Sequence, residues 1–226
     1  MAKLLFTAFL ADARGKVNGT VFSKNRGGAY ARTKVTPSNP QTSFQSTVRQ
    51  RLAGLAAQFR ALTASQILSW NVAVNDFPVS NIFGNTIHLT GLQLYVRLNA
   101  NLEGIGAAQI SDPPLPVGFS FLDPEINTLS NVALTLDLTA ATVDEYYLIE
   151  ATPSVSPGKF FVKNLYRVIG NVQGTGAAIV ANNQFANYSA KFGAPVTGQR
   201  VSLRVSLVNS VTGQKSVPVN FNGIVA

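Results

Sequence analysis

The sequence contains no cysteine and only one histidine, His88, among its 226 residues. Without cysteine there can be neither a disulfide nor a thiolate metal site. A single histidine argues against a histidine-based metal cluster and against a Ser–His–Asp triad, because in each of these sites histidine must occupy one specific position. No apolar run reaches the ~20 residues that a membrane-spanning helix needs. We therefore predict no cofactor, no metal site and no membrane partner.

Charged residues are scarce, and they are separated by sign along the chain. They make up 12% of the residues, about half of the ~25% that is typical of soluble domains. Residues 1–60 carry ten basic side chains and one acid, residues 61–158 carry nine acids and one base, and residues 159–226 carry seven bases and no acid. Such blocks predict a polyanion or an acidic protein surface as partner. They also allow the basic segment of one copy to lie on the acidic middle of a neighbouring copy.

Residues 1–40 are predicted to form an extended basic arm that contains a β-hairpin. Apolar and polar residues alternate over Val17–Ser23 and again over Ala29–Val35. Asn25–Gly28 lies between these two runs and is typical of a hairpin loop. The basic side chains of this region would therefore project from strands and turns, and not from a recognition helix.

The two ends of this arm have patterns of their own. Lys3–Leu10 is apolar and compatible with a strand, whereas Thr36–Pro40 contains two prolines. Proline blocks both a helix and an inner strand, so an extended connector is expected there.

Residues 41–106 are predicted to be helical. One helix face is indicated by apolar residues at three- and four-residue steps, namely Phe44, Val48, Leu52, Leu55 and Phe59.

Thr63 to Gln66 is typical of a capping box that begins a second helix ending at Pro78, with Ile67, Trp70, Val74 and Phe77 inward. Thr90-Gly91 predicts the start of a third, closed by Gly104 and Gly106, with Leu92, Tyr95, Val96, Leu98 and Leu102 inward.

The rest of the chain is predicted to be a proline-rich linker or entry strand, residues 107–128, followed by a β-sandwich, residues 129–226. Strands are expected over four main runs: Val132–Leu138, Tyr146–Ala151, Phe160–Ile169 and Val201–Val208, before a turn at Thr212-Gly213 and a closing run over Val217–Val225. Strands with turns at this spacing over about a hundred residues are typical of an antiparallel sandwich. The overall fold class is therefore α+β.

Residue patterns that carry chemistry are few. Asp144-Glu145 could be a carboxylate pair for acid–base work, but its place before a strand favours a solvated turn. The Gly-rich stretches lack the spacing of a phosphate-binding loop. We therefore predict that the protein is not an enzyme and has no catalytic residues.

The basic segment holds the candidate binding residues, in which cations are interleaved with aromatic side chains. Nine residues are expected to contact a partner: Arg14, Lys16, Lys24, Arg26, Tyr30, Arg32, Lys34, Arg49 and Arg51. Such a surface can neutralise phosphates, with affinity that falls steeply with salt, or can dock on an acidic protein.

A longer pattern runs through the same residues. It consists of Gly15-Lys16, Val21-Phe22, Asn25-Arg26-Gly27, Tyr30, Arg32 and Pro37-Ser38-Asn39-Pro40-Gln41-Thr42, and then Gln45, Arg49, Leu62-Thr63 and Trp70-Asn71. This order resembles a poorly characterised family of small structural proteins encoded by tailed bacteriophages and prophages. Beyond residue 130, the strand pattern resembles an immunoglobulin-like or fibronectin type III module. The first resemblance implies a structural role in the virion, with no catalytic residues.

Virion proteins act through contacts with neighbouring subunits, and an extended arm can cover a large surface of such a neighbour. The expected role is therefore a capsid-associated auxiliary or cementing protein, located in the virion after assembly in the bacterial cytoplasm. A head–tail connector or tail component is the first alternative, and a basic nucleic-acid-binding protein is the second. The expected partners are other virion proteins, such as the major capsid protein, and further copies of this chain in a homo-oligomer.

Overall fold

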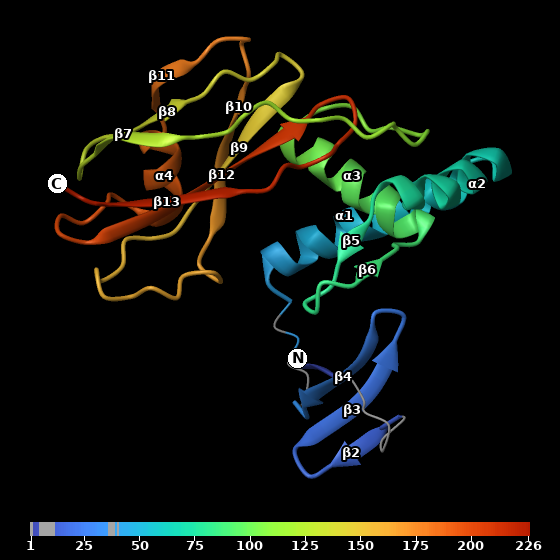
Figure 1. Ribbon diagram of the computed structural model, residues 1–226. Helices are drawn as coiled ribbons and strands as arrows, with labels where there is room; N and C mark the ends of the chain where they lie inside the picture. Colours follow the sequence, from blue (N-terminus) through green and yellow to red (C-terminus); the bar gives the residue numbers. More distant parts are fainter. Residues whose placement is uncertain (1, 5–11, 36–38, 40) are drawn as a thin grey trace.

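The computed structural model describes residues 2–4, 12–35, 39 and 41–226, and over these it is a mixed α+β structure dominated by antiparallel sheets (Figure 1). Three parts follow one another along the chain: a small basic sheet, a group of helices, and two larger sheets. None of the helices in the described residues is long and apolar enough to cross a membrane.

The basic sheet has the strand order β1-β4-β3-β2. Its strands are β1 (Ala2–Leu4), β2 (Gly15–Val17), β3 (Thr20–Asn25) and β4 (Gly28–Thr33). The predicted hairpin is confirmed, because Asn25 pairs with Gly28 across a two-residue turn and β3 runs antiparallel to β4. Gly28 has a φ of 100°, a region that glycine adopts without steric cost.

Two sequence-based expectations for this region lie partly outside the described residues. Of the run Lys3–Leu10, only Lys3 and Leu4 are described, and both belong to β1. Of the connector Thr36–Pro40, only Asn39 is described.

The helical part contains three α-helices and a short hairpin in the described chain. Its elements are α1 (Ser43–Ala61), α2 (Ala64–Ala73), the 3-10 turn η1 (Val74–Asp76), β5 (Val79–Ser80), β6 (Thr86–Ile87) and α3 (Gly91–Ile105). Thr63 and Thr90 each accept a hydrogen bond from the backbone of a glutamine three residues on, whose side chain bonds back. The two predicted helix starts are therefore confirmed, and each cap is worth ~1 kcal/mol.

The core of this part lies where α2 and α3 meet the second half of α1. Trp70 is fully buried, its ring is edge-on to Tyr95 with centroids 5.2 Å apart, and its indole N–H donates to the Ser111 carbonyl at 2.7 Å. Leu55 and Phe59 are the buried residues of α1. The predicted helix is confirmed, but this face is open in the first half of α1, where Phe44, Val48 and Leu52 are 72%, 65% and 54% exposed. The predicted apolar stripe is real, but the neighbouring helices cover only half of it.

Smaller corrections follow from the same packing. Leu92 was expected to point inward but is 37% exposed, whereas Leu94, which the pattern missed, is fully buried. The second helix ends at Ala73, before the short turn η1, and not at Pro78. The predicted end of the third helix is confirmed, because Gly106 takes a left-handed φ of 77° at its C-cap.

Two antiparallel sheets make up the C-terminal part, with strand orders β11-β8-β7 and β10-β9-β12-β13. Their elements are β7 (Glu125–Leu129), β8 (Leu134–Leu138), β9 (Glu145–Ala151), β10 (Arg167–Gln173), β11 (Ile179–Asn183), α4 (Phe185–Phe192), β12 (Arg200–Asn209) and β13 (Val219–Ile224). Strand residues of both sheets alternate inward to share one core, and Tyr188 of α4 is fully buried in it. The Tyr188 hydroxyl donates to the Thr152 carbonyl at 3.0 Å, which satisfies it inside the core.

The predicted strands at β8, β9, β12 and β13 are confirmed within a few residues, but the prediction for Phe160–Ile169 is wrong. Residues 160–166 are loop and turn, and the strand begins at Arg167. Strand β11 and helix α4 were not predicted, and β7 begins inside the segment expected to be a linker or entry strand, in line with the second of these alternatives. β10 carries a register shift between Val168 and Gly170, which explains why its alternation is hard to recognise.

The helices and the large sheets meet at the turn that follows β12. Asn101 of α3 donates to the Gly213 carbonyl at 2.8 Å. Gly213 has a φ of 70°, and a Cβ there would lie 2.4 Å from the Leu98 carbonyl oxygen. A side chain would therefore push α3 away, so this glycine permits the close contact.

Candidate partner-binding surfaces

The pairing of the basic sheet sorts its side chains between two faces. Lys16 pairs with Val21, and Val21 pairs with Arg32, so these three residues form one row across β2, β3 and β4. Ser23 and Tyr30 pair in the next row on that face. Paired residues share a face of a sheet, and successive residues alternate. We call this surface, formed by Lys16, Val21, Ser23, Tyr30 and Arg32, the cationic face.

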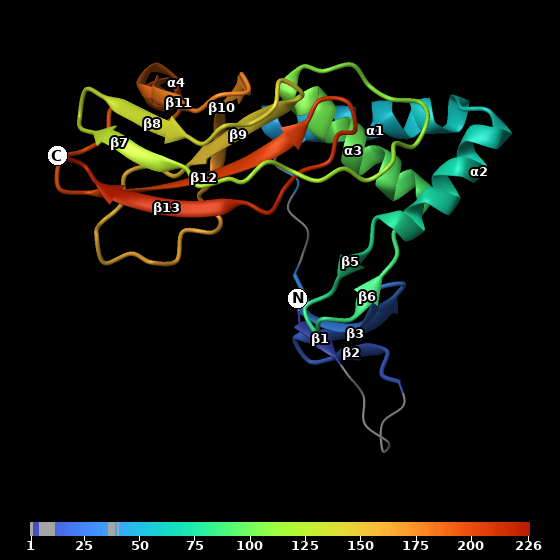
Figure 2. The ribbon, with the colours of Figure 1, turned by 45° about the horizontal axis from the view of Figure 1, so that its top comes forward.

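The opposite face of the same sheet is mainly apolar. It carries Phe22, Ala29 and Ala31, and Ala29 is buried. A cleft on this side is lined by Leu4 and Ala29 from the sheet and by Phe83 and Ile87 from the β5–β6 hairpin. In Figure 2 this hairpin reaches down to the basic sheet. The cationic face therefore points away from the hairpin, with Lys16 and Arg32 exposed.

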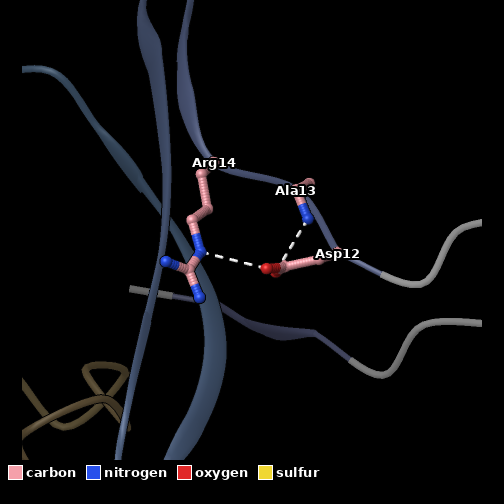
Figure 3. Close-up of polar contacts among 3 residues, drawn as sticks. All are labelled: Asp12, Ala13 and Arg14. Atoms are coloured by element: carbon pink, nitrogen blue, oxygen red, sulfur yellow. Dashed lines mark hydrogen bonds and ion pairs between the residues drawn. The ribbon is translucent and has the colours of Figure 1, made fainter.

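The remaining predicted binding residues of this region lie around the sheet in different positions. Lys24 projects from the apolar face, Arg26 is in the hairpin turn, and Lys34 follows β4, and all three are exposed. Arg14 precedes β2, and its Nε lies 3.0 Å from Asp12 Oδ2, as Figure 3 shows. Both side chains of this pair are largely exposed, so the ion pair contributes little to stability.

The two predicted arginines of α1 have their own partners. Arg49 donates to the Asn39 side chain at 2.8 Å, which ties the helix to the chain that precedes it. Arg51 Nε lies 2.8 Å from Glu103 Oε1 of α3, across the helix pair. The nine predicted residues thus do not form one patch. The structure brings together Lys16, Tyr30 and Arg32 and places the others elsewhere.

Two exposed surfaces were not predicted from the sequence. One is the uncovered half of the α1 stripe, formed by Phe44, Val48 and Leu52, which continues into a groove lined by Leu52, Ala56, Leu92 and Val96. The heptad-like pattern was visible, but burial depends on which helices pack against it, and a pattern alone does not show that.

The second is a loop of residues 156–166, which we call the aromatic loop. Phe160 is 80% exposed and Phe161 is 73% exposed. A signal for this loop was present, since Pro157-Gly158 precedes the two phenylalanines and Lys159 and Lys163 flank them. Proline and glycine favour a turn over a strand at that point.

The carboxylate pair Asp144-Glu145 is divided by the fold, so the prediction of a solvated turn is right for Asp144 and wrong for Glu145. Asp144 is exposed, whereas Glu145 is only 3% exposed. Glu145 accepts from the Ser120 amide at 2.9 Å, the Ser120 hydroxyl at 2.6 Å and the Thr142 amide at 3.0 Å. Burial raises the pKa of Glu145, but these hydrogen bonds from Ser120 and Thr142 outweigh it and leave the pKa below its usual range. The geometry is that of a structural carboxylate, which holds the segment before β7 against β9.

Over the residues that the structure describes, no three histidine, aspartate or glutamate side chains are grouped as a metal site. No protein-family model matches the chain, and no curated protein or solved structure matches it either.

Proposed function

We propose that this chain is a non-enzymatic structural protein of a tailed-phage particle. Within the particle, the proposed role is that of a capsid-associated auxiliary or cementing protein. It would bind the major capsid protein, and further copies of itself, through the basic sheet. The observation that carries the proposal is the cationic face, because strand pairing places Lys16, Tyr30 and Arg32 on the same side of the basic sheet.

The chemistry of this face fits a protein neighbour with an acidic surface. Tyr30 supplies a flat ring with a polar end, a combination that is enriched in protein interfaces. The cations on the same face would steer an acidic partner and fix the orientation in which it docks. The resemblance of residues 13–75 to phage structural proteins supports a particle as the place where that partner is found.

We also propose that the two large sheets form an immunoglobulin-like module of the fibronectin type III kind. The support is the order in which the strands enter the two sheets: β7 and β8 in one, β9 and β10 in the other, then β11 back in the first and β12 and β13 in the second. Switching between sheets in this way is the basis of Greek-key sandwiches. An experimental structure with another strand order would contradict this assignment.

Incorporation into particles tests the main proposal. We expect mass spectrometry of purified particles to detect the wild-type protein. The double substitution Lys16→Glu with Arg32→Glu should reduce its incorporation strongly, because it turns the cationic face acidic. Arg60→Glu with Arg97→Glu is the matched control, since it changes the net charge equally with both residues exposed and outside the basic sheet. Absence of the wild-type protein from the particle would refute the structural role, and equal incorporation of both variants would refute the docking face.

Two alternatives remain as proposals of lower rank. A head–tail connector or tail component would use the same face toward a different neighbour, and cross-linking of particles followed by mass spectrometry would identify that neighbour. A basic nucleic-acid-binding protein is favoured by the same exposed cations, since phosphates bind such surfaces without sequence preference. Strong retention of unrelated duplex DNA at low salt, combined with absence from particles, would support it.

A further inference from the structure

The aromatic loop is a built feature of the larger sheet. Two turns shape it, closed by hydrogen bonds from the Lys159 amide to the Ser156 carbonyl and from the Leu165 amide to the Val162 carbonyl, both 2.9 Å. Phe160 and Phe161 lie between these turns. In Figures 1 and 2 the loop, coloured amber, extends away from the two sheets.

Two arginines of β12 hold the loop. Arg200 Nη2 donates to the Pro157 carbonyl at 2.6 Å and to the Lys159 carbonyl at 2.7 Å. Its guanidinium carbon also lies 4.3 Å from the centroid of the Phe160 ring. Four residues on, the Arg204 guanidinium lies 4.0 Å from the centroid of the Tyr166 ring. The loop is thus fixed at both ends, and its exposed rings do not need to be ordered when a ligand arrives.

The rings stand in a strongly positive surrounding. Lys159 and Lys163 flank them and are exposed, as is Arg167 at the start of β10. No aspartate or glutamate occurs from residue 151 to the end of the chain. The larger sheet carries two acids, both on β9: Glu150 forms an ion pair with Arg204 at 3.4 Å, and Glu145 is buried. A ligand that touches the loop therefore meets exposed rings and positive charge, with little negative charge nearby.

From this combination we infer that the aromatic loop binds single-stranded nucleic acid. Unpaired bases stack on aromatic rings whatever their sequence, and lysine and arginine side chains neutralise the phosphates that connect them. A base can lie on Phe160 while Arg200 stays on the other side of the ring, as cation–π contacts allow. Duplex DNA offers no free base faces, so single strands should be preferred.

Exposed phenylalanines beside lysines also occur on protein surfaces that bind membranes. The Arg200 contact argues against membrane binding. Inserting Phe160 into hydrocarbon would either take the guanidinium along, at the cost of burying its charge, or break the contact that orders the loop. Stacking on a base requires neither change.

Fluorescence anisotropy with the full-length protein tests the inference. The probes are a short labelled oligothymidylate, an oligouridylate of equal length, and a DNA duplex. We expect Phe160→Ala with Phe161→Ala to weaken binding of the single-stranded probes by at least about 5-fold, which is the low end of the ~1–3 kcal/mol per stacked base. Phe160→Tyr with Phe161→Tyr should retain binding, because it keeps the rings. Phe121→Ala is the control, since Phe121 is 77% exposed and lies outside the loop.

The outcome does not depend on the cationic face. If the alanine variant binds both single-stranded probes as tightly as the wild type, the inference is overturned. If the phenylalanine substitutions weaken binding to phosphatidylglycerol vesicles but not to either single strand, the inference is also overturned. If Lys16→Glu with Arg32→Glu weakens duplex binding but leaves the effect of the phenylalanines intact, the two surfaces are separate. Failure of the loop experiment therefore leaves the proposed role in the particle untouched, and the reverse also holds.

Discussion

Glu145 is the residue whose chemistry the fold uses most clearly. Its carboxylate is buried and receives hydrogen bonds from Ser120 and Thr142. Hydrogen bonds to a charged group contribute about 1.5–3 kcal/mol each when their loss leaves a buried partner unpaired. The side chain therefore attaches the segment before β7 to the sheet.

Replacing this carboxylate should change both stability and its dependence on pH. We expect Glu145→Gln to lower the free energy of unfolding at pH 7 by about 1–3 kcal/mol, because the new amide N–H₂ faces N–H donors. The lowered folded-state pKa stabilises the protein above the unfolded pKa of ~4.3, and that contribution is lost as pH falls through the folded-state pKa. Urea unfolding between pH 7 and pH 3 should show a steeper acid loss in the wild type. Asp144→Asn is the exposed control, and equal slopes in the wild type and Glu145→Gln would contradict the prediction.

Gly213 permits a second prediction at the scale of one residue. A Cβ at Gly213 would clash with the Leu98 carbonyl, whereas Gly198 has a similar φ of 77° with open space around it. Both alanine variants should lose about 1–2 kcal/mol from the left-handed backbone. Gly213→Ala should lose clearly more, because it also displaces α3. Thermal unfolding of the pair measures the difference, and equal losses would mean that α3 does not press on this turn.

At the scale of elements, α1 is a helix of two unequal halves. Its second half packs on α3 through Leu55 and Phe59, while its first half exposes Phe44, Val48 and Leu52. An apolar stripe left open in this way is typical of a surface that meets a partner.

Substitutions in the two halves should have different effects. We expect Leu55→Ala to lower the free energy of unfolding by about 2–5 kcal/mol, because it opens a cavity in the helical core. Val48→Gln should change it by less than about 0.5 kcal/mol, as for other exposed positions. Denaturant unfolding of both variants tests this. A large loss for Val48→Gln would mean that the stripe is covered in the isolated protein.

Features set by neighbouring residues could be predicted from the sequence, whereas features set by distant contacts could not. The features that depend on neighbouring residues only are the capping boxes at Thr63 and Thr90, the Asn25–Gly28 turn and the alternation of β12. The exposure of Phe44, the course of the Phe160 loop and the role of Glu145 could not be predicted, because each depends on residues distant in sequence. For the cationic face, the sequence indicated which residues are basic, but only the pairing of β2, β3 and β4 showed which of them share a surface.

At the scale of the whole molecule, positive charge occurs on two separate surfaces: the basic sheet near the N-terminus and the aromatic loop of the larger sheet. The formal net charge is +8, so any anionic partner will be attracted over a distance that salt shortens. Binding that depends on both surfaces would respond to ionic strength more steeply than binding to either one.

Salt titration of duplex DNA binding gives a whole-molecule prediction that separates the candidate functions. If phosphates bind the cationic face, Lys16→Glu with Arg32→Glu should reduce the slope of log affinity against log salt by about 2, near 0.9 for each lost contact. If the face binds a virion protein, the variant should lose incorporation while this slope stays nearly unchanged. Arg60→Glu with Arg97→Glu again serves as the charge-matched control.

The single tryptophan has a practical consequence. Trp70 is fully buried between α2 and α3 and contacts Tyr95, far from the core shared by the two large sheets. Its emission will therefore report unfolding of the helical part alone, whereas far-ultraviolet circular dichroism follows the helices and the sheets together. Coincident curves from the two signals would show that both parts unfold as one cooperative unit, as expected if the Asn101–Gly213 contact couples them. Separated curves would show two units, and the experiment needs no added label.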